Sequence, residues 1–184
     1  MKLFHSIRTT IAVLAVAAVP VVAVPASASA APGCQEIWGS LPEANNRVSA
    51  GTLATVRAGR HTCFDRVVFD VTGAETTYSA RYVPDVYRAG AGHLVPLRGG
   101  AKLEIMLGVN AFDDDGNWAF QPPNESELAN VAGFRTLRQI AYAGDTEGAA
   151  WVGIGVRARL PFRVFTLDGP GSGSRVVIDI AHRW

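Results

Sequence analysis

The sequence predicts an all-β domain, a sandwich or a barrel, and three observations lead to this prediction. Short runs rich in Val, Ile, Phe, Tyr and Thr recur along the chain. Gly and Asp turn signals separate these runs, and no stretch shows a convincing 3.6-residue hydrophobic period. About 150 residues follow the apolar N-terminal segment, which suits one domain with one core.

The first thirty residues (1–30) are predicted to be a secretory signal peptide, so we expect an exported protein. Lys2 and Arg8 form a positive start, residues 11–24 form an apolar core, and "ASASA" places small residues before a cleavage site after Ala30. A lipoprotein modified at Cys34 is the competing interpretation. Because the apolar core ends well upstream of this cysteine, we expect a mature chain with no transmembrane or lipid anchor.

The next segment, residues 31–50, is turn-rich and predicted to be irregular, and the domain itself is predicted to span 51–184. Strands are expected within residues 53–59, 63–73, 77–85, 93–100, 101–109, 149–169 and 174–184. Residues 125–144 are expected to hold one helical turn before a strand. The run "RVVFD" at 66–70 returns as "RVVID" at 175–179, which suggests two similar halves with their strands in equivalent places.

The run "GVRARLPFRVF" at residues 155–165 reads as one half-buried strand. With period two, its apolar residues share one face, and Arg157, Arg159 and Arg163 share the other. Pro161 interrupts the run and is expected to mark a bend or an edge position. A row of three cations either binds an acidic partner or keeps the outer face of a sheet exposed to solvent.

The charge balance excludes two classes of protein. The signal peptide carries two of the 17 basic residues and none of the 16 acidic ones, so the mature chain has a net charge of 15 − 16 = −1. Nucleic-acid binders and polybasic membrane-surface domains carry a marked basic excess, which is absent here.

Cys34 and Cys63 are the only cysteines. In an exported protein two cysteines most simply pair, so we predict one intramolecular disulfide. A catalytic thiol is the alternative, and it would need a free cysteine in an oxidising compartment.

Several segments carry a resemblance to a known family. "RHTCFDRVVFDVTG", "RYVPDV", "VPLRGGAKLEIMLG" and the block from "VAGFRTLRQIAYAG" to "RVVIDIAHRW" resemble the AMIN-like domain of exported actinobacterial proteins. That domain is similar to the AMIN domain found ahead of cell-wall amidases. The resemblance implies a β-sandwich of two small sheets, which localises proteins on the envelope by binding peptidoglycan or a neighbouring envelope component. It does not imply catalysis, a cofactor or a metal.

The residues themselves give little support for an enzyme. His61, His93 and His182 show no metal-ligand spacing, and neither a Gly-x-Ser-x-Gly elbow nor a phosphate-binding loop is present. Asp145 and Glu147 form a carboxylate pair, the kind that glycan hydrolysis uses, but two carboxylates are an unspecific signal. We therefore predict no catalytic residues and no metal site, and we interpret "FDDDGNW" at 112–118 as a solvated hairpin turn.

The binding candidates are cations and one aromatic ring. Arginines can hydrogen-bond carboxylates or phosphates, and an indole can stack on the C–H face of a sugar. If Asp70, Glu104 or Asp179 lies on a neighbouring strand, the arginine row is neutralised by cross-strand pairs. If the arginines share a free face, the face can dock an anionic polymer. The candidate residues are Arg66, Arg157, Arg159, Arg163, Arg175 and Trp118.

The sequence thus predicts a secreted or wall-associated, non-catalytic domain that binds peptidoglycan or another anionic wall polymer. Two alternatives stay open. One is a small secreted hydrolase of wall peptides or glycans, and the other is a protein-interaction module of the envelope that uses exposed strand edges.

Overall fold

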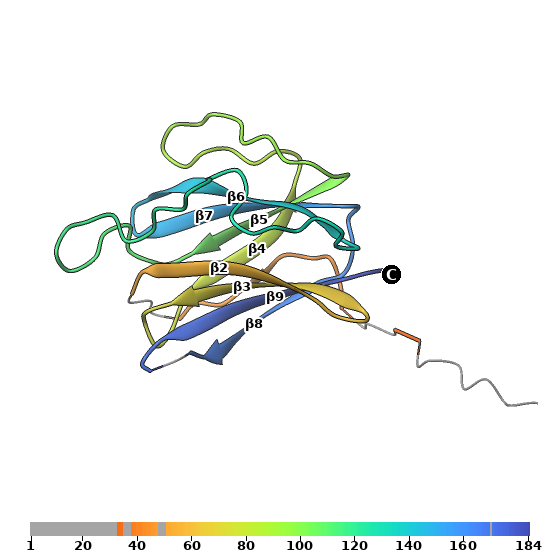
Figure 1. Ribbon diagram of the computed structural model, residues 1–184, viewed down its shortest axis with the longest axis horizontal. Coiled ribbons are helices and arrows are strands. Elements are labelled where there is room, and N and C mark those ends of the chain that lie inside the picture. The colour runs from red at the N-terminus through yellow and green to blue at the C-terminus, as the bar shows by residue number, and fades with distance from the viewer. Residues whose placement is uncertain (1–32, 35–37, 48–50, 170) are drawn as a thin grey trace, which may run out of the picture. The chain divides into compact units, whose positions relative to one another are not determined.

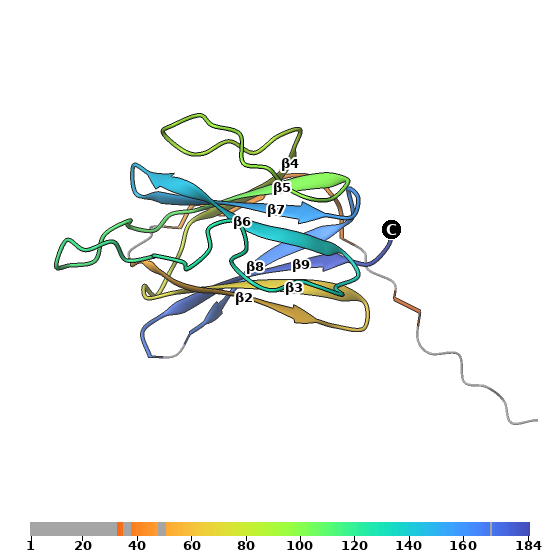
Figure 2. The ribbon, with the colours of Figure 1, turned by 45° about the horizontal axis from the view of Figure 1, so that its top comes forward.

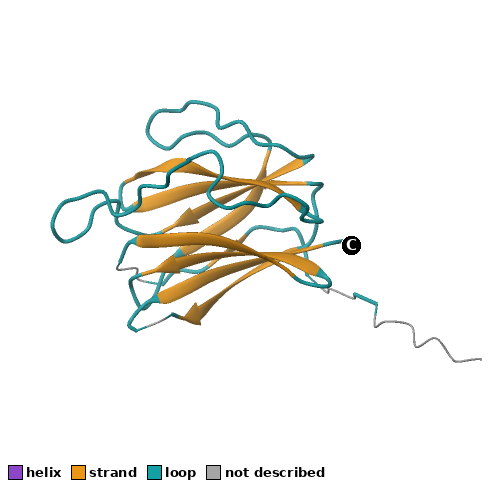
Figure 3. Cartoon of the chain, in the orientation of Figure 1, coloured by secondary structure: helices purple, strands orange, loops and turns teal. Residues whose placement is uncertain are grey.

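Nine β-strands and no helix make up the described part of the chain in the computed structural model (Figure 3). The structure describes residues 33–34, 38–47, 51–169 and 171–184. The predicted signal peptide lies outside these ranges, and so do residues 31–32, 35–37 and 48–50 of the following segment. All nine strands belong to one unit, Cys34–Trp184.

The strands form two antiparallel sheets that face each other, which confirms the predicted β-sandwich (Figures 1 and 2). The five-stranded sheet has the order β1-β4-β5-β7-β6, and the four-stranded sheet has the order β2-β3-β9-β8. The strands of the first sheet are β1 (Glu43–Ala44), β4 (Tyr78–Val83), β5 (Ala101–Leu107), β6 (Leu137–Thr146) and β7 (Ala149–Val156). Those of the second are β2 (Leu53–Arg60), β3 (Phe64–Val71), β8 (Phe162–Asp168) and β9 (Ser174–Ala181).

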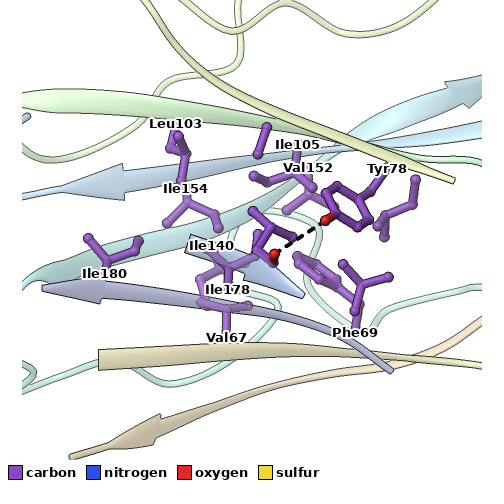
Figure 4. Packing of buried hydrophobic residues seen from close by; sticks show 14 of the residues in the cluster. Val67, Phe69, Tyr78, Leu103, Ile105, Ile140, Val152, Ile154, Ile178 and Ile180 are labelled. Carbon is purple, nitrogen blue, oxygen red and sulfur yellow. Dashed lines mark hydrogen bonds between the residues drawn. The ribbon is translucent and has the colours of Figure 1, made fainter. Parts of the chain in front are cut away.

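Alternating apolar residues of both sheets build the core (Figure 4). Phe69 and Ile178 reach it from the four-stranded sheet, and Ile105 and Ile154 reach it from the five-stranded sheet; all four are fully buried. Each such side chain contributes about 1.5 to 3 kcal/mol of transfer free energy relative to an exposed one. The strands therefore form where period-two patterning offers one apolar face to the opposite sheet.

The prediction of one strand through residues 155–165 is wrong. β7 ends at Val156 and β8 begins at Phe162, so the chain changes sheets between them. The bend expected at Pro161 lies in this crossover, where the Arg157 amide donates to the Thr136 carbonyl (2.9 Å) instead of to a strand partner. Buried and more exposed side chains continue to alternate through the crossover, because this segment also packs one side against the core.

Two further expectations also differ from the structure. Residues 93–100 form no strand, and within them Leu94 makes an isolated antiparallel bridge to Tyr87. This segment crosses β7 closely: a Cβ on Gly155 would lie 2.0 Å from the Arg98 carbonyl oxygen, so only glycine fits there.

The helical turn expected before β6 is absent as well. An extended segment runs along the β6 edge, where the Leu128 amide donates to Ile140 (2.8 Å) and the Tyr142 amide donates to Glu125 (2.7 Å). These hydrogen bonds cover an edge that would otherwise be open to other strands.

The repeated runs at 66–70 and 175–179 are neighbours in one sheet. β3 and β9 pair so that Val68 lies opposite Val177, with Arg66 opposite Asp179 and Asp70 opposite Arg175. The two copies are thus related by a local two-fold axis, and they do not mark two separate halves of the domain.

A disulfide joins Cys34 to Cys63 with a Cα–Cα distance of 5.3 Å, as the sequence predicts. Cys63 lies in the tight turn between β2 and β3, and its carbonyl accepts the His182 amide (2.9 Å). The Arg183 guanidinium donates to the Cys34 carbonyl (3.0 Å). The disulfide therefore fixes the start of the unit to the β2–β3 turn, and the hydrogen bonds of His182 and Arg183 hold the last residues at the same place.

Replacing Cys34 by Ser should destabilise the domain without unfolding the sheets. The bond spans 29 residues of chain, and closing a loop of this size stabilises a fold by about 3 to 4 kcal/mol on the chain-entropy model. Denaturant unfolding should show a loss of this order, and Cys63→Ser should lose the same amount. A native protein that titrates two free thiols would contradict the pairing.

Candidate functional site

The outer face of the four-stranded sheet gathers half of the binding candidates. Antiparallel register places Arg66 of β3 opposite Asp179 of β9, which in turn lies opposite Arg163 of β8. Four residues further along β3, Asp70 lies opposite Arg175. Because alternate residues of a strand share a face, all five side chains project outward from this sheet.

Asp179 is the buried anchor of this face. Its side chain is 0% exposed, and it accepts two hydrogen bonds from Arg66 (2.6 and 2.9 Å) and two from Arg163 (2.9 and 2.8 Å). The carboxylate raises the pKa of the Arg66 guanidinium through these hydrogen bonds. A carboxylate removed from water needs such partners, so this triad holds three strands in register.

The same guanidinium groups also lie over aromatic rings. Arg163 lies 4.4 Å from the centroid of Trp38 and 5.0 Å from that of Phe165. Arg66 lies 5.3 Å from the ring of Phe64 and 5.4 Å from that of Phe165. Cation–π contacts of this kind fix the orientation of the cations without neutralising them.

Asp70 forms a second, more open cluster on the face. It accepts hydrogen bonds from Arg57 (2.7 and 3.0 Å), from Thr55 (2.6 Å) and from Arg175 (3.3 Å). The Arg57 hydrogen bonds are the main cause that lowers the pKa of Asp70 to about 2. Arg57 was not among the candidates predicted from the sequence. The turn between His61 and Phe64 sets the β2–β3 register, and this register places Arg57 beside the cluster. The turn was therefore the one sequence signal that could have identified Arg57.

The face keeps a positive charge after pairing. Arg57, Arg66, Arg163 and Arg175 meet two carboxylates, so the outward side chains of these strands carry 4 − 2 = +2. Three of these arginines line a hollow of about 320 Å³, which also has apolar side chains in its lining. Its lining includes Arg57, His61, Arg66, Val68, Arg175 and Val177.

Arg157 and Arg159 do not join this row, because they lie in the crossover between the sheets. Arg157 donates to the carbonyl of His182 (2.6 Å). Arg159 donates to the carbonyl and the hydroxyl of Ser40 (2.9 and 3.0 Å) and lies 5.3 Å from the Tyr82 ring centroid. Both side chains are exposed and bond to uncharged oxygens, so they add positive charge beside the C-terminus.

Glu104, the third carboxylate considered as a partner for the arginine row, lies in the other sheet. It pairs with Arg81 at 2.8 Å. Trp118 also lies outside both sheets, in the loop between β5 and β6, where it bridges to Phe112.

The histidines occupy separate places. His61 stacks on Phe64 with a centroid distance of 4.4 Å, and the His93 carbonyl accepts the Arg88 amide (2.7 Å) in the segment that crosses β7. His182 lies against Asp65, with 3.0 Å between Nε2 and Oδ1. Among the residues that the structure describes, no group of three or more His, Cys, Asp and Glu side chains is arranged to hold a metal ion.

The His182–Asp65 contact has a structural explanation. Asp65 is buried and also accepts the backbone amides of Thr136 (2.6 Å) and Leu137 (3.1 Å). The carboxylate thereby satisfies backbone groups at the start of β6, where the chain enters the five-stranded sheet. Sequence reasoning had not singled out Asp65.

Comparison with known families decides the identity of this fold. The AMIN-like domain family model matches residues 51–182, which covers most of the sandwich. The chain belongs to the AMIN-like domain family. AMIN-like domains are non-catalytic localisation modules associated with the cell envelope. No curated protein and no solved structure matches the chain. Within the described ranges, this AMIN-like domain contains no helix with the length and apolarity of a membrane span.

Asp70→Asn should make the domain less sensitive to acid. The pKa of Asp70 is lowered from 3.8 to about 2, so its pairing stabilises the fold fully above pH 3.8 and is lost as the pH falls toward 2. Thermal midpoints measured from neutral pH downward should therefore fall less steeply in the variant across this window. Identical slopes in the two proteins would contradict this assignment.

Proposed function

We propose that this AMIN-like domain is an exported, non-catalytic module that associates with the cell envelope by binding an anionic wall polymer, with peptidoglycan as the leading ligand. The observation that carries the proposal is the arginine face: four outward arginines pair with two aspartates, and three of them, Arg57, Arg66 and Arg175, line a hollow of about 320 Å³. The family supports an envelope role for such a surface.

The pairing of these arginines does not prevent binding. The side chains of Arg57 and Arg175 are 54% and 34% exposed although both contact Asp70. A guanidinium carries five N–H donors, and Asp70 takes two from Arg57 and one from Arg175. The remaining donors can hold a carboxylate or phosphate of the polymer in a bidentate manner.

The fixed geometry of the face also favours binding. Aspartates and aromatic rings already restrict the guanidiniums of Arg66 and Arg163, so a ligand loses less side-chain entropy on ordering them. Each exposed contact is weak and screened by salt. A polymer that offers many anions gains from repeated contacts, and the binding should therefore depend on chain length and on ionic strength.

Arg157 and Arg159 extend this proposal to the crossover. Neither guanidinium has a carboxylate partner among the described residues, so both contribute uncompensated positive charge. We assign them a long-range electrostatic role and assign direct contact to Arg57, Arg66, Arg163 and Arg175.

Protein binding by strand addition is a second candidate function, because β2 is an edge strand whose outer side is open. His61 donates to Phe64, so the hydrogen-bonded pairs along β2 include Arg57, and the amides of Val56 and Ala58 point away from β3. No described backbone group accepts these two amides. A partner strand could pair there.

Arg175→Gln should weaken sedimentation with purified peptidoglycan and reduce its salt dependence. Asp70 keeps its two hydrogen bonds from Arg57, so the fold should lose less than about 1 kcal/mol of stability. The matched control is Arg81→Gln, which breaks an exposed pair on the other sheet and should bind like the wild type. Equal retention of all three proteins at physiological salt would contradict the arginine face.

The double variant Arg157→Gln/Arg159→Gln tests the crossover separately. We expect a smaller loss of polymer binding, which disappears at high salt because the effect is long-range. Undiminished binding at low salt by a stably folded double variant would remove these two residues from the site.

A further inference from the structure

A second hollow, of about 510 Å³, lies where the loop after β5 meets the turn between β6 and β7. This loop extends beyond the ends of the strands (Figure 1). The hollow combines two aromatic rings with polar side chains, and no arginine or lysine lines it. The lining residues used below are Asn110, Phe112, Trp118, Asp145 and Glu147.

Two large apolar rings are exposed at this hollow. Phe112 is 47% and Trp118 is 52% exposed, and their centroids lie 4.4 Å apart with the planes inclined by 36°. The rings lean on one another, so each has one covered side and leaves area open to the hollow. Two adjacent rings with about half of their surface exposed are typical of a contact surface.

The rings are held rigidly by a short hairpin. Phe112 and Trp118 bridge as antiparallel partners, and the Asp113 amide donates to the Asn117 carbonyl (2.9 Å). The Asp113 carboxylate accepts the amides of Asp115 (3.1 Å) and Asn117 (2.8 Å). The aspartates predicted to form a solvated turn thus include one that fixes the turn, and the aromatic platform is preorganised.

The residues of β6 and of the β6–β7 turn add two carboxylates to the lining of the hollow. Asp145 accepts the hydroxyl of Tyr142 (3.0 Å), which orients it. Glu147 has a φ of 51°, and it is the non-glycine residue with positive φ among those described. Glycine or asparagine suits this turn position better than glutamate, so the turn geometry does not explain the carboxylate.

We propose that this hollow binds a pyranose ring that carries no acidic substituent. The C–H face of the sugar stacks on the uncovered side of Trp118, whose other side packs on Phe112, and sugar hydroxyls donate to the carboxylates of Asp145 and Glu147. Carboxylates accept hydroxyl hydrogen bonds strongly, and they repel an anionic sugar. The site goes beyond the arginine face and does not rest on it, since the two surfaces share no lining residue.

Titration of the full chain with chitotriose, a neutral trimer of N-acetylglucosamine, tests this site. We expect saturable binding by calorimetry, and Trp118→Ala should weaken it by about tenfold, which corresponds to one ring contact. The matched control is Trp184→Ala, because Trp184 is 71% exposed and does not line the hollow. Equal affinity of the wild type and Trp118→Ala, or no binding by the wild type, would overturn the proposal.

Two further arms separate this site from a structural role and from the arginine face. Glu147→Gly should raise the thermal midpoint, because it relieves the positive φ, and at the same time weaken chitotriose binding. Arg175→Gln should leave chitotriose binding unchanged even where it lowers retention by peptidoglycan. Equally tight binding of an acidic trimer such as trigalacturonate would overturn the assigned ligand chemistry, as would unchanged binding in Glu147→Gly.

Discussion

The buried carboxylate of Asp179 is the constraint on which the four-stranded sheet depends. A fully buried carboxylate is costly unless charged partners surround it, and here one comes from each neighbouring strand. Arg66 and Arg163 can both reach it in one register alone, since a shift by one residue would turn every side chain of a strand to the opposite face. The apolar residues between them then meet the core. The electrostatic pairing on the outside thus specifies the packing on the inside.

Much of the fold follows from period-two patterning, which predicted β2, β3, β4, β5 and β9 close to their observed places. The sequence could not reveal that residues 155–165 change sheets, because the alternation of buried and exposed side chains continues through the crossover. The extended cover of the β6 edge was mistaken for a helical turn for a related reason: its apolar residues meet the core at uneven spacing. Hydrogen bonds between residues far apart in the sequence fix both the crossover and the segment along β6. The local pattern of apolar residues gives no information about such bonds.

The site was partly predictable for the same physical reason. Arg66, Arg163 and Arg175 were recognised from strand alternation, and Asp70 and Asp179 were considered as their partners. Arg57 was missed because its neighbours depend on the β2–β3 register. The structure has two unlike surfaces, one cationic and one aromatic with carboxylates. A wall polymer offers both anionic groups and uncharged sugar rings, so the two proposals are compatible with one ligand.

The pairing of "RVVFD" with "RVVID" has a consequence for the direction of a bound chain. Rotation by half a turn about the sheet normal exchanges Arg66 with Arg175 and Asp70 with Asp179. The two arginines lie on neighbouring strands and are offset by about 13 Å in the strand direction, and the same holds for the two aspartates. The outward groups of β3 and β9 therefore follow the same order in both directions, whereas Arg57 and Arg163 on the outer strands are not exchanged by this rotation. If this face binds a polymer as proposed, its two central strands present the same order of groups to either direction of the bound chain.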